Sequence, residues 1–220
     1  MNKAYRGYRK FGLLAGSALL ALIAGVAAGW MTEQISAPQP PRLASATALL
    51  NQTKPLPVFS LVDDKGHTFN NARLAGHWSF LFFGYTHCPD VCPTTLSILN
   101  KAMRSIARQG DAANTQVVFV SIDPQRDTPN TLKGYLHYFN PKFVGVTGRP
   151  AAINALTSTL GIPHARIADP SGHGNYLMDH SASILLIGPQ GKLVALFSAP
   201  QKAPLLASDF HKLRSYYENS

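Results

Sequence analysis

Two largely apolar runs of strand length restrict the fold of this chain more than any other feature. The first run, WSFLFFGY, covers residues 78–85, and the second, QVVFVSI, covers residues 116–122. Runs without polar alternation are typical of strands buried on both faces of a sheet. Between them, residues 91–108 place apolar side chains at helical spacing. We therefore expect a strand–helix–strand unit at the centre of an α/β domain.

Hydrophobic periodicity extends this unit on both sides. Residues 59–62 and 68–69 flank the turn sequence DDKG and predict a short hairpin. Thr128 is a candidate cap of the next helix, and Gly161 is a candidate end of a later one. The predicted fold is an α/β sandwich, with a central mixed sheet flanked by helices. Further helices are expected at 131–139, 151–160 and 208–217, and further strands at 143–146, 183–187 and 193–197.

The N-terminus predicts a membrane anchor. Residues 1–10 hold four basic and no acidic residues, and residues 11–31 then run without a charge. At about 1.5 Å per residue, a helix of that length spans about 31 Å, close to the hydrocarbon thickness of a bilayer. The basic tail predicts a cytoplasmic N-terminus, an inner-membrane single pass and a periplasmic C-terminal domain. A cleaved signal peptide is the alternative, and it also places the rest of the chain outside the cytoplasm.

Once the anchor is set apart, charge no longer suggests nucleic acid as a partner. The whole chain has a net charge of +9 and a pI of about 9.7. Residues 32–220 hold 16 basic and 11 acidic residues, a net charge of +5, and no basic run there is longer than two residues. We interpret the proline-rich residues 32–56 as a linker and residues 57–220 as one domain.

The two cysteines of the chain lie at the predicted junction of strand and helix. Cys88 and Cys92 stand in the sequence THCPDVCP, close to the expected start of the helix. A helix N-terminus stabilises thiolates, and a spacing of four residues brings both sulfurs to one side. Three interpretations remain open: a structural disulfide, a thiol–disulfide oxidoreductase, which would more typically use Cys-x-x-Cys, and a soft-metal site.

A soft-metal site would require a third ligand, for which His180 is the best candidate. The sequence around it, MDHS, directly precedes the apolar strand predicted at residues 183–187. A buried strand that runs into a cysteine loop and then a helix resembles the thioredoxin arrangement. In thioredoxin-like sheets, the loop before that later strand faces the cysteine turn and usually carries a proline, which is missing here. Two thiolates and an imidazole favour copper, although their spacing does not exclude zinc.

Three segments carry a resemblance to one family. Residues 84–96 read GYTHCPDVCPTTL, residues 120–129 read VSIDPQRDTP, and residues 178–193 read MDHSASILLIGPQGKL. The three segments follow one another within residues 57–200, after the expected membrane anchor. In this order they resemble the Sco/SenC family of copper-binding, thioredoxin-fold assembly proteins of cytochrome c oxidase.

The resemblance implies a function and its ligands. Cys88, Cys92 and His180 would bind a copper ion as Cu(I) or Cu(II), and the two cysteines would be redox-active thiols able to form a disulfide. The chain would be a copper chaperone whose partner is the copper-site subunit of cytochrome c oxidase. The alternative is a thiol–disulfide oxidoreductase that keeps the cysteines of that subunit reduced. Another copper chaperone or a thioredoxin-like reductant would be a further partner.

Five further residues are candidates for a role near the metal site. Asp123, Arg126 and Asp127 match a family segment that we interpret as supporting, with Asp123 ending a strand and the other two charges holding a loop in place. His164 and His173 lie in a segment that departs from the family pattern. They are candidates for an additional ligand or for surface residues.

Overall fold

The computed structural model describes residues 19, 21–27, 29, 39–49, 55–168 and 176–219. The chain divides into two units, of which Pro41–Ser215 contains the fold described below. Residues 21–27 are helical, but none of the helices in the described stretches combines the length and the apolar character that crossing a membrane requires. The basic tail and most of the predicted anchor lie outside the described residues, so the anchor stays a prediction.

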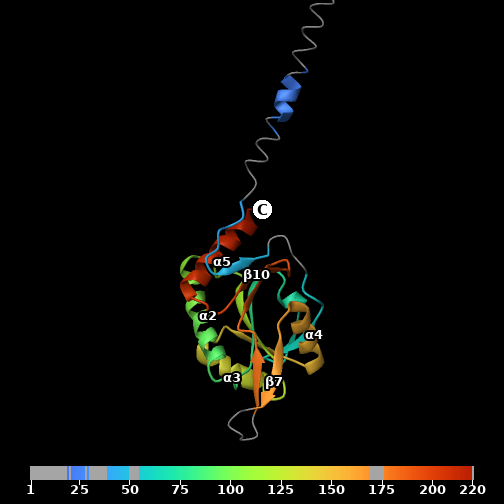
Figure 1. The fold of residues 1–220 in the computed structure, drawn as a ribbon, viewed down its shortest axis with the longest axis vertical. Coiled ribbons are helices and arrows are strands. Elements are labelled where there is room, and N and C mark those ends of the chain that lie inside the picture. Colours follow the sequence, from blue (N-terminus) through green and yellow to red (C-terminus); the bar gives the residue numbers. More distant parts are fainter. Residues whose placement is uncertain are drawn as a thin grey trace, which may run out of the picture. The chain divides into compact units, whose positions relative to one another are not determined.

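A mixed sheet of eight strands, counted among the described residues, forms the centre of the larger unit (Figure 1). The strand order is β1-β10-β9-β4-β5-β6-β2-β3. Neighbours β4, β5 and β6 run parallel, whereas the other neighbouring strands pair antiparallel. The strands are β1 (Ala46–Ala48), β2 (Ser60–Asp63), β3 (Thr68–Asn70), β4 (Trp78–Gly84), β5 (Thr115–Ser121), β6 (Val144–Thr147), β9 (Ile184–Ile187) and β10 (Leu193–Phe197).

The two apolar runs of the sequence form the two middle parallel strands. All seven residues of β4 are buried, and β5 pairs with β4 along its whole length, from Trp78 beside Thr115 to Gly84 beside Ser121. Their carboxyl ends therefore finish side by side at one edge of the sheet. This edge carries the cysteine turn, because α2 (Val91–Arg108) follows β4 after a six-residue connection.

Helices cover both faces of the sheet. Figure 1 shows α2, α3 (Pro129–Phe139) and α5 (Ala203–Glu218) on one side and α4 (Pro150–Leu160) on the other. On the first side, the ring of Phe210 in α5 packs edge-on against Trp78 at 5.7 Å between ring centroids. The sheet, its flanking helices and the order of elements confirm the predicted thioredoxin-like α/β sandwich.

The predicted helix ends follow from local chemistry. Thr128 caps α3 by accepting a hydrogen bond from the backbone N–H of Thr131, and a proline occupies the first helical position. Gly161 ends α4 in the left-handed conformation, with a φ of 68°, which glycine adopts without steric cost. Helix α5 begins five residues before the predicted start at residue 208, because Pro204 is tolerated in a first turn.

Two elements were not expected from the sequence. A separate two-stranded hairpin, β7 (His164–Ala168) and β8 (Tyr176–His180), precedes β9. Strand β1 lies inside residues 32–56, which the sequence analysis treated as a linker. The folded domain therefore begins earlier than expected, because β1 pairs with β10 and forms one edge of the sheet.

A buried carboxylate holds the segment around β1. Asp209 of α5 is fully buried and accepts hydrogen bonds from the backbone N–H groups of Ala44, Ser45 and Ala46 and from the Ser45 hydroxyl. Burial alone would raise the pKa of Asp209, but the hydrogen bonds from Ala44 and Ser45 outweigh it and lower the pKa below its ordinary value. The ionised carboxylate therefore joins the start of the domain to its last helix.

Candidate metal centre

The two cysteines flank the start of α2. Cys88 lies in the connection after β4, and Cys92 is the second residue of the helix. The backbone N–H of Cys92 points at the sulfur of Cys88, with 3.4 Å between the two atoms. The N-cap residue Asp90 makes no side-chain capping bond, so the Cys88 sulfur accepts from one of the free N–H groups at the helix start. Negative charge on Cys88 is stabilised there.

His180 approaches the cysteines from the last position of β8. Its Nε2 atom lies 3.4 Å from the sulfur of Cys92, and its Nδ1 atom lies 3.0 Å from the carbonyl oxygen of Ser181. A carbonyl oxygen only accepts, so in the neutral ring Nδ1 carries the proton and the Nε2 lone pair is left for a ligand. The rings of Phe82 and Tyr85 pack against the imidazole at 6.2 and 5.9 Å between centroids. These contacts set the ring's orientation.

The structure thus brings together the three residues singled out in the sequence. One ligand atom each from Cys88, Cys92 and His180 lies within 4.8 Å of the others, although His180 is 88 residues from Cys92 in the chain. Both cysteines are free. Two sulfurs and one imidazole nitrogen at these separations form a donor set suited to one soft metal ion.

The two cysteines differ in burial and in acidity. Cys92 is completely buried, whereas Cys88 is partly exposed. The hydrogen bond from the Cys92 thiol lowers the pKa of Cys88 to about 4, against the opposing effect of burial, and His180 contributes in the same direction. The same hydrogen bond, together with burial, raises the pKa of Cys92. At neutral pH the metal-free pair therefore holds one proton, on Cys92, and Cys88 is a thiolate.

Gly84 provides the space that Cys92 occupies. A Cβ atom at position 84 would lie 2.7 Å from the Cys92 sulfur and 2.9 Å from the ring of Phe119. Both distances are shorter than van der Waals contact, so a larger residue would displace the sulfur or the ring. Sequence analysis did not single out Gly84, because a close approach between distant segments leaves no local pattern.

A cysteine-side brace, formed by Thr86, Ser121 and Asp127, holds the turn before Cys88. The Asp127 carboxylate is fully buried and accepts hydrogen bonds from the Thr86 N–H at 3.0 Å, the Thr86 hydroxyl at 2.6 Å and the Ser121 hydroxyl at 2.6 Å. Ser121 is the last residue of β5, and Thr86 lies two residues before Cys88. The brace therefore ties the cysteine turn to the neighbouring strand.

A histidine-side clasp, formed by Asp123, Arg126 and Tyr176, holds the start of β8. Asp123 accepts a hydrogen bond from the Tyr176 hydroxyl at 2.6 Å and forms an ion pair with Arg126. Arg126 donates to the Tyr176 carbonyl oxygen at 3.0 Å, and its guanidinium lies 3.6 Å from the centre of the Tyr176 ring. The supporting part expected of Asp123, Arg126 and Asp127 thus takes the form of contacts to both sides of the centre.

The two histidines of the divergent segment are outside the donor set. His164 is the direct strand partner of His180, but its Nε2 atom lies 3.0 Å from the side-chain oxygen of Asn154 in α4. His164 is not within ligand distance of the two cysteines. His173 lies outside the described residues.

Fold and site together define a class: a thioredoxin-like domain with a Cys-x-x-x-Cys turn and a distant histidine at one soft-metal centre. The sequence model of the SCO1/SenC family matches residues 48–215. The chain therefore belongs to the SCO1/SenC family. Among its curated relatives, an SCO2-like protein of Rickettsia felis is 34% identical over 179 residues, which cover 81% of this chain and 86% of that protein.

Solved structures of the family share the fold. The crystal structure of ScoI from Arabidopsis thaliana with copper bound superposes with a TM-score of 0.69 at 30% identity, covering 74% of this chain and 100% of that one. The structure of ScoI from Bradyrhizobium japonicum with copper bound gives a TM-score of 0.65 at 36% identity, covering 74% of this chain and 99% of that one.

Proposed function

We propose that this protein binds copper through Cys88, Cys92 and His180 and delivers it to the dinuclear copper site of cytochrome c oxidase. The observation that carries the proposal is the convergence of three soft-metal donor atoms within 4.8 Å. Thiolate and imidazole ligands suit copper, and the set of three protein ligands that the described residues provide fits copper better than structural zinc, which takes four. The copper-bound structures of the two ScoI proteins support the choice of metal.

The chain's own groups prepare the centre for a metal ion. Cys88 offers a thiolate, His180 offers the Nε2 lone pair, and only the Cys92 thiol must lose a proton. Oxidation of the Cys88 thiolate and the Cys92 thiol to a disulfide removes two electrons and one proton and leaves no thiolate to coordinate a metal. Disulfide formation and copper binding therefore exclude one another, and the redox state of the pair controls copper capture.

The proposal includes a membrane location. Residues 11–31 would anchor the protein in the inner membrane, with the domain in the periplasm, where the copper-site subunit of the oxidase is the recipient. Leu22, Ile23 and Val26, on the helical residues 21–27, are 68%, 56% and 53% exposed, which suits a lipid environment. Protease accessibility of the domain in spheroplasts, with and without detergent, tests this location.

Copper content of ligand variants tests the ligand assignment. The reduced full-length chain, kept in detergent without oxygen, should take up one copper ion in the wild type. C88S, C92S and H180A should each lose that ion, and the exposed His137→Ala on α3 should retain it. After addition of Cu(II), the thiolate charge-transfer absorption should disappear in H180A. Wild-type stoichiometry in C88S would refute the ligand set.

A second candidate function, a thiol–disulfide oxidoreductase, is favoured by one observation. Cys88 is partly exposed, so its thiolate can attack the disulfide of another molecule. Cys92 lies buried behind it, in the position of a resolving thiol. H180A separates the two functions, because it removes an imidazole ligand and leaves both thiols. Loss of copper with preserved reduction of a disulfide substrate would show that the thiol chemistry is independent, whereas loss of both would tie it to the copper centre.

A further inference from the structure

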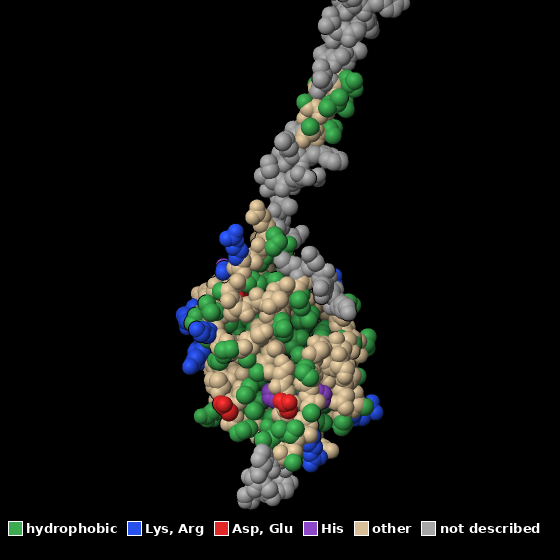
Figure 2. Space-filling view, viewed as in Figure 1, with side chains coloured by type: hydrophobic (Ala, Val, Ile, Leu, Met, Phe, Trp, Pro, Cys, Tyr) green, Lys and Arg blue, Asp and Glu red, His purple; other side chains and the backbone are tan. Residues whose placement is uncertain are grey.

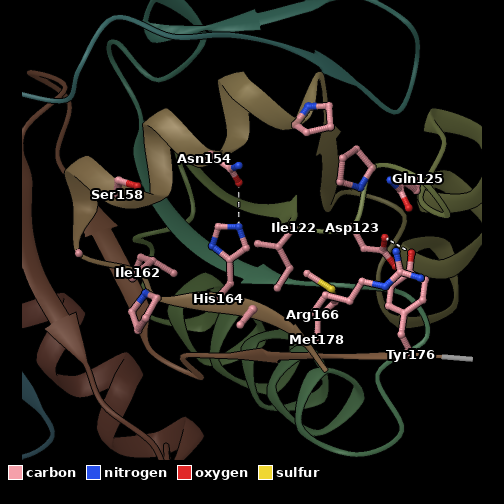
Figure 3. Close-up of a pocket in the computed structure, with 15 residues that line it drawn as sticks. Ile122, Asp123, Gln125, Asn154, Ser158, Ile162, His164, Arg166, Tyr176 and Met178 are labelled. Atoms are coloured by element: carbon pink, nitrogen blue, oxygen red, sulfur yellow. Dashed lines mark hydrogen bonds between the residues drawn. The ribbon is translucent and has the colours of Figure 1, made fainter. Parts of the chain in front are cut away.

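A groove runs along α4 outside the metal centre (Figure 3). Its volume is about 730 Å³, within the range of ordinary ligand sites. One wall is the face of α4 that carries Pro150, Asn154 and Ser158, and the other is the β7–β8 hairpin. These three helix positions follow each other at intervals of four, so the wall is about 12 Å long.

The groove shares strand β8 with the metal centre. Tyr176 and Met178 line it, and His180 lies two residues farther along the same strand. On the facing strand, His164 also lines the groove and pairs directly with His180. A molecule lying in the groove would therefore lie alongside the strand that carries the histidine ligand.

The charge of the groove is positive. Among the described residues that line it, the one carboxylate, Asp123, is already engaged by Arg126 and Tyr176. Arg166 projects from β7 and stacks on the Tyr176 ring at 3.6 Å, and no carboxylate of the described residues lies within ion-pair distance of it. This leaves one guanidinium that a negatively charged group could neutralise.

The remaining lining suits an extended peptide. Ile122 and Ile162 are buried and form an apolar floor, while the side chains of Gln125, Asn154 and Ser158 offer donors and acceptors along the groove (Figure 3). An extended chain rises about 3.3 Å per residue, so about four residues match the length of the α4 wall. Lys and Arg side chains also gather along the α2 and α5 flank of the domain, and acidic side chains are sparse on that face (Figure 2).

We propose that this groove, lined by α4 and the β7–β8 hairpin, docks an extended acidic segment of the protein that receives copper. A carboxylate of that segment pairs with Arg166, and apolar side chains rest on Ile122 and Ile162. Docking there places the recipient next to His180. The inference rests on the proposed function, because it assigns the recipient's contact surface.

Copper transfer tests the groove separately from copper binding. The copper-loaded full-length chain is mixed with the separately produced, metal-free copper-site domain of the oxidase from the same organism, and the transfer rate is measured at low ionic strength. R166E reverses the charge in the groove, and S158W fills it from α4, at a position that is not part of the histidine-side clasp. K101E makes the same charge change on an exposed position of α2, outside the groove.

All three variants should hold copper like the wild type. R166E and S158W should transfer it roughly tenfold more slowly, K101E should transfer at the wild-type rate, and added salt should slow the wild type more than R166E. Transfer at the wild-type rate by S158W would overturn docking in the groove, even if R166E were slow, because Arg166 would then act only through long-range charge. A wild-type chain that binds no copper would instead refute the proposed function.

Discussion

The cysteine side and the histidine side of the metal centre are built differently. The cysteines follow β4, whose residues are all buried, and the cysteine-side brace joins their turn to β5 through a fully buried carboxylate. His180 stands on a separate two-stranded hairpin, of which β7 is almost entirely exposed. The difference indicates that the core holds the cysteine turn, whereas the strand that carries His180 is held by a few polar contacts and only the imidazole ring itself packs on the core, against Phe82 and Tyr85. Each prediction below tests this contrast.

The largest expected effect is a difference in alkylation between the thiols of Cys88 and Cys92. In the reduced, metal-free protein, iodoacetamide should modify Cys88 with a pH midpoint near 4, because its pKa is lowered to about 4 and it is partly exposed. Cys92 should stay unmodified through pH 9, because it is buried and its pKa is raised. Mass spectrometry of peptides from samples alkylated across the pH range measures both. In the unfolded chain both cysteines should react alike, and equal reaction in the folded chain would contradict the asymmetry.

Asp127→Asn should cause the largest loss of stability. The amide replaces one of the carboxylate oxygens, so at least one of the three donors from Thr86 and Ser121 loses its buried acceptor. We expect a loss of about 2–3 kcal/mol in the free energy of unfolding. Urea denaturation of the metal-free protein measures it. Asp179→Asn, an exposed carboxylate beside His180, should change the stability by less than about 0.5 kcal/mol, and an equal loss in both variants would be evidence against a specific brace.

Gly84→Ala should also lower the free energy of unfolding through the cysteine side of the centre, but by less than Asp127→Asn. The new methyl group would overlap the Cys92 sulfur and the Phe119 ring, at a cost of about 1–3 kcal/mol, and displacement of the sulfur should weaken copper binding. Gly134→Ala is the matched control, because a Cβ at that helical position of α3 would meet nothing within 4 Å. It should stabilise the protein by about 0.5–1 kcal/mol. Unfolding curves and copper titrations of the two variants measure the contrast.

Tyr176→Phe should have the smallest effect on stability and act on the histidine side. It removes the hydrogen bond to Asp123 from a hairpin that is only partly buried, so we expect a loss of under about 1 kcal/mol. The ring remains stacked on Arg126. The position of His180 should nevertheless shift, visible as a change in the EPR spectrum of the Cu(II) form. An unchanged spectrum would show that the clasp does not position the histidine.

Much of this arrangement was predictable from local sequence. The runs at 78–85 and 116–122 predicted the central strands, because a strand buried on both faces is apolar at most of its positions. The positions of Cys88 and Cys92 followed from the strand–helix junction. His180 was a candidate through its place before β9 and through the family resemblance.

Other features depend on contacts between distant segments, which leave no periodic pattern. Strands β7 and β8 pair with each other instead of entering the main sheet, so their residues show no buried face. Strand β1 has three small or polar residues and exists through its pairing with β10. The hydrogen bonds between Asp127 and Thr86, which are 41 positions apart, likewise could not be predicted from local sequence.

The carboxylate of Asp209 has a mechanical consequence. It receives four hydrogen-bond donors from Ala44, Ser45 and Ala46, where the chain enters the domain. A force that pulls on the chain from its N-terminal side would act first on these bonds and on the β1–β10 pairing. Strand β1 is the edge of the sheet opposite β3. Strands β9 and β10 lie between that edge and β4. The load would therefore be absorbed at the rim of the sheet, and the spacing of Cys88, Cys92 and His180 would be shielded from tension applied to the preceding segment of the chain.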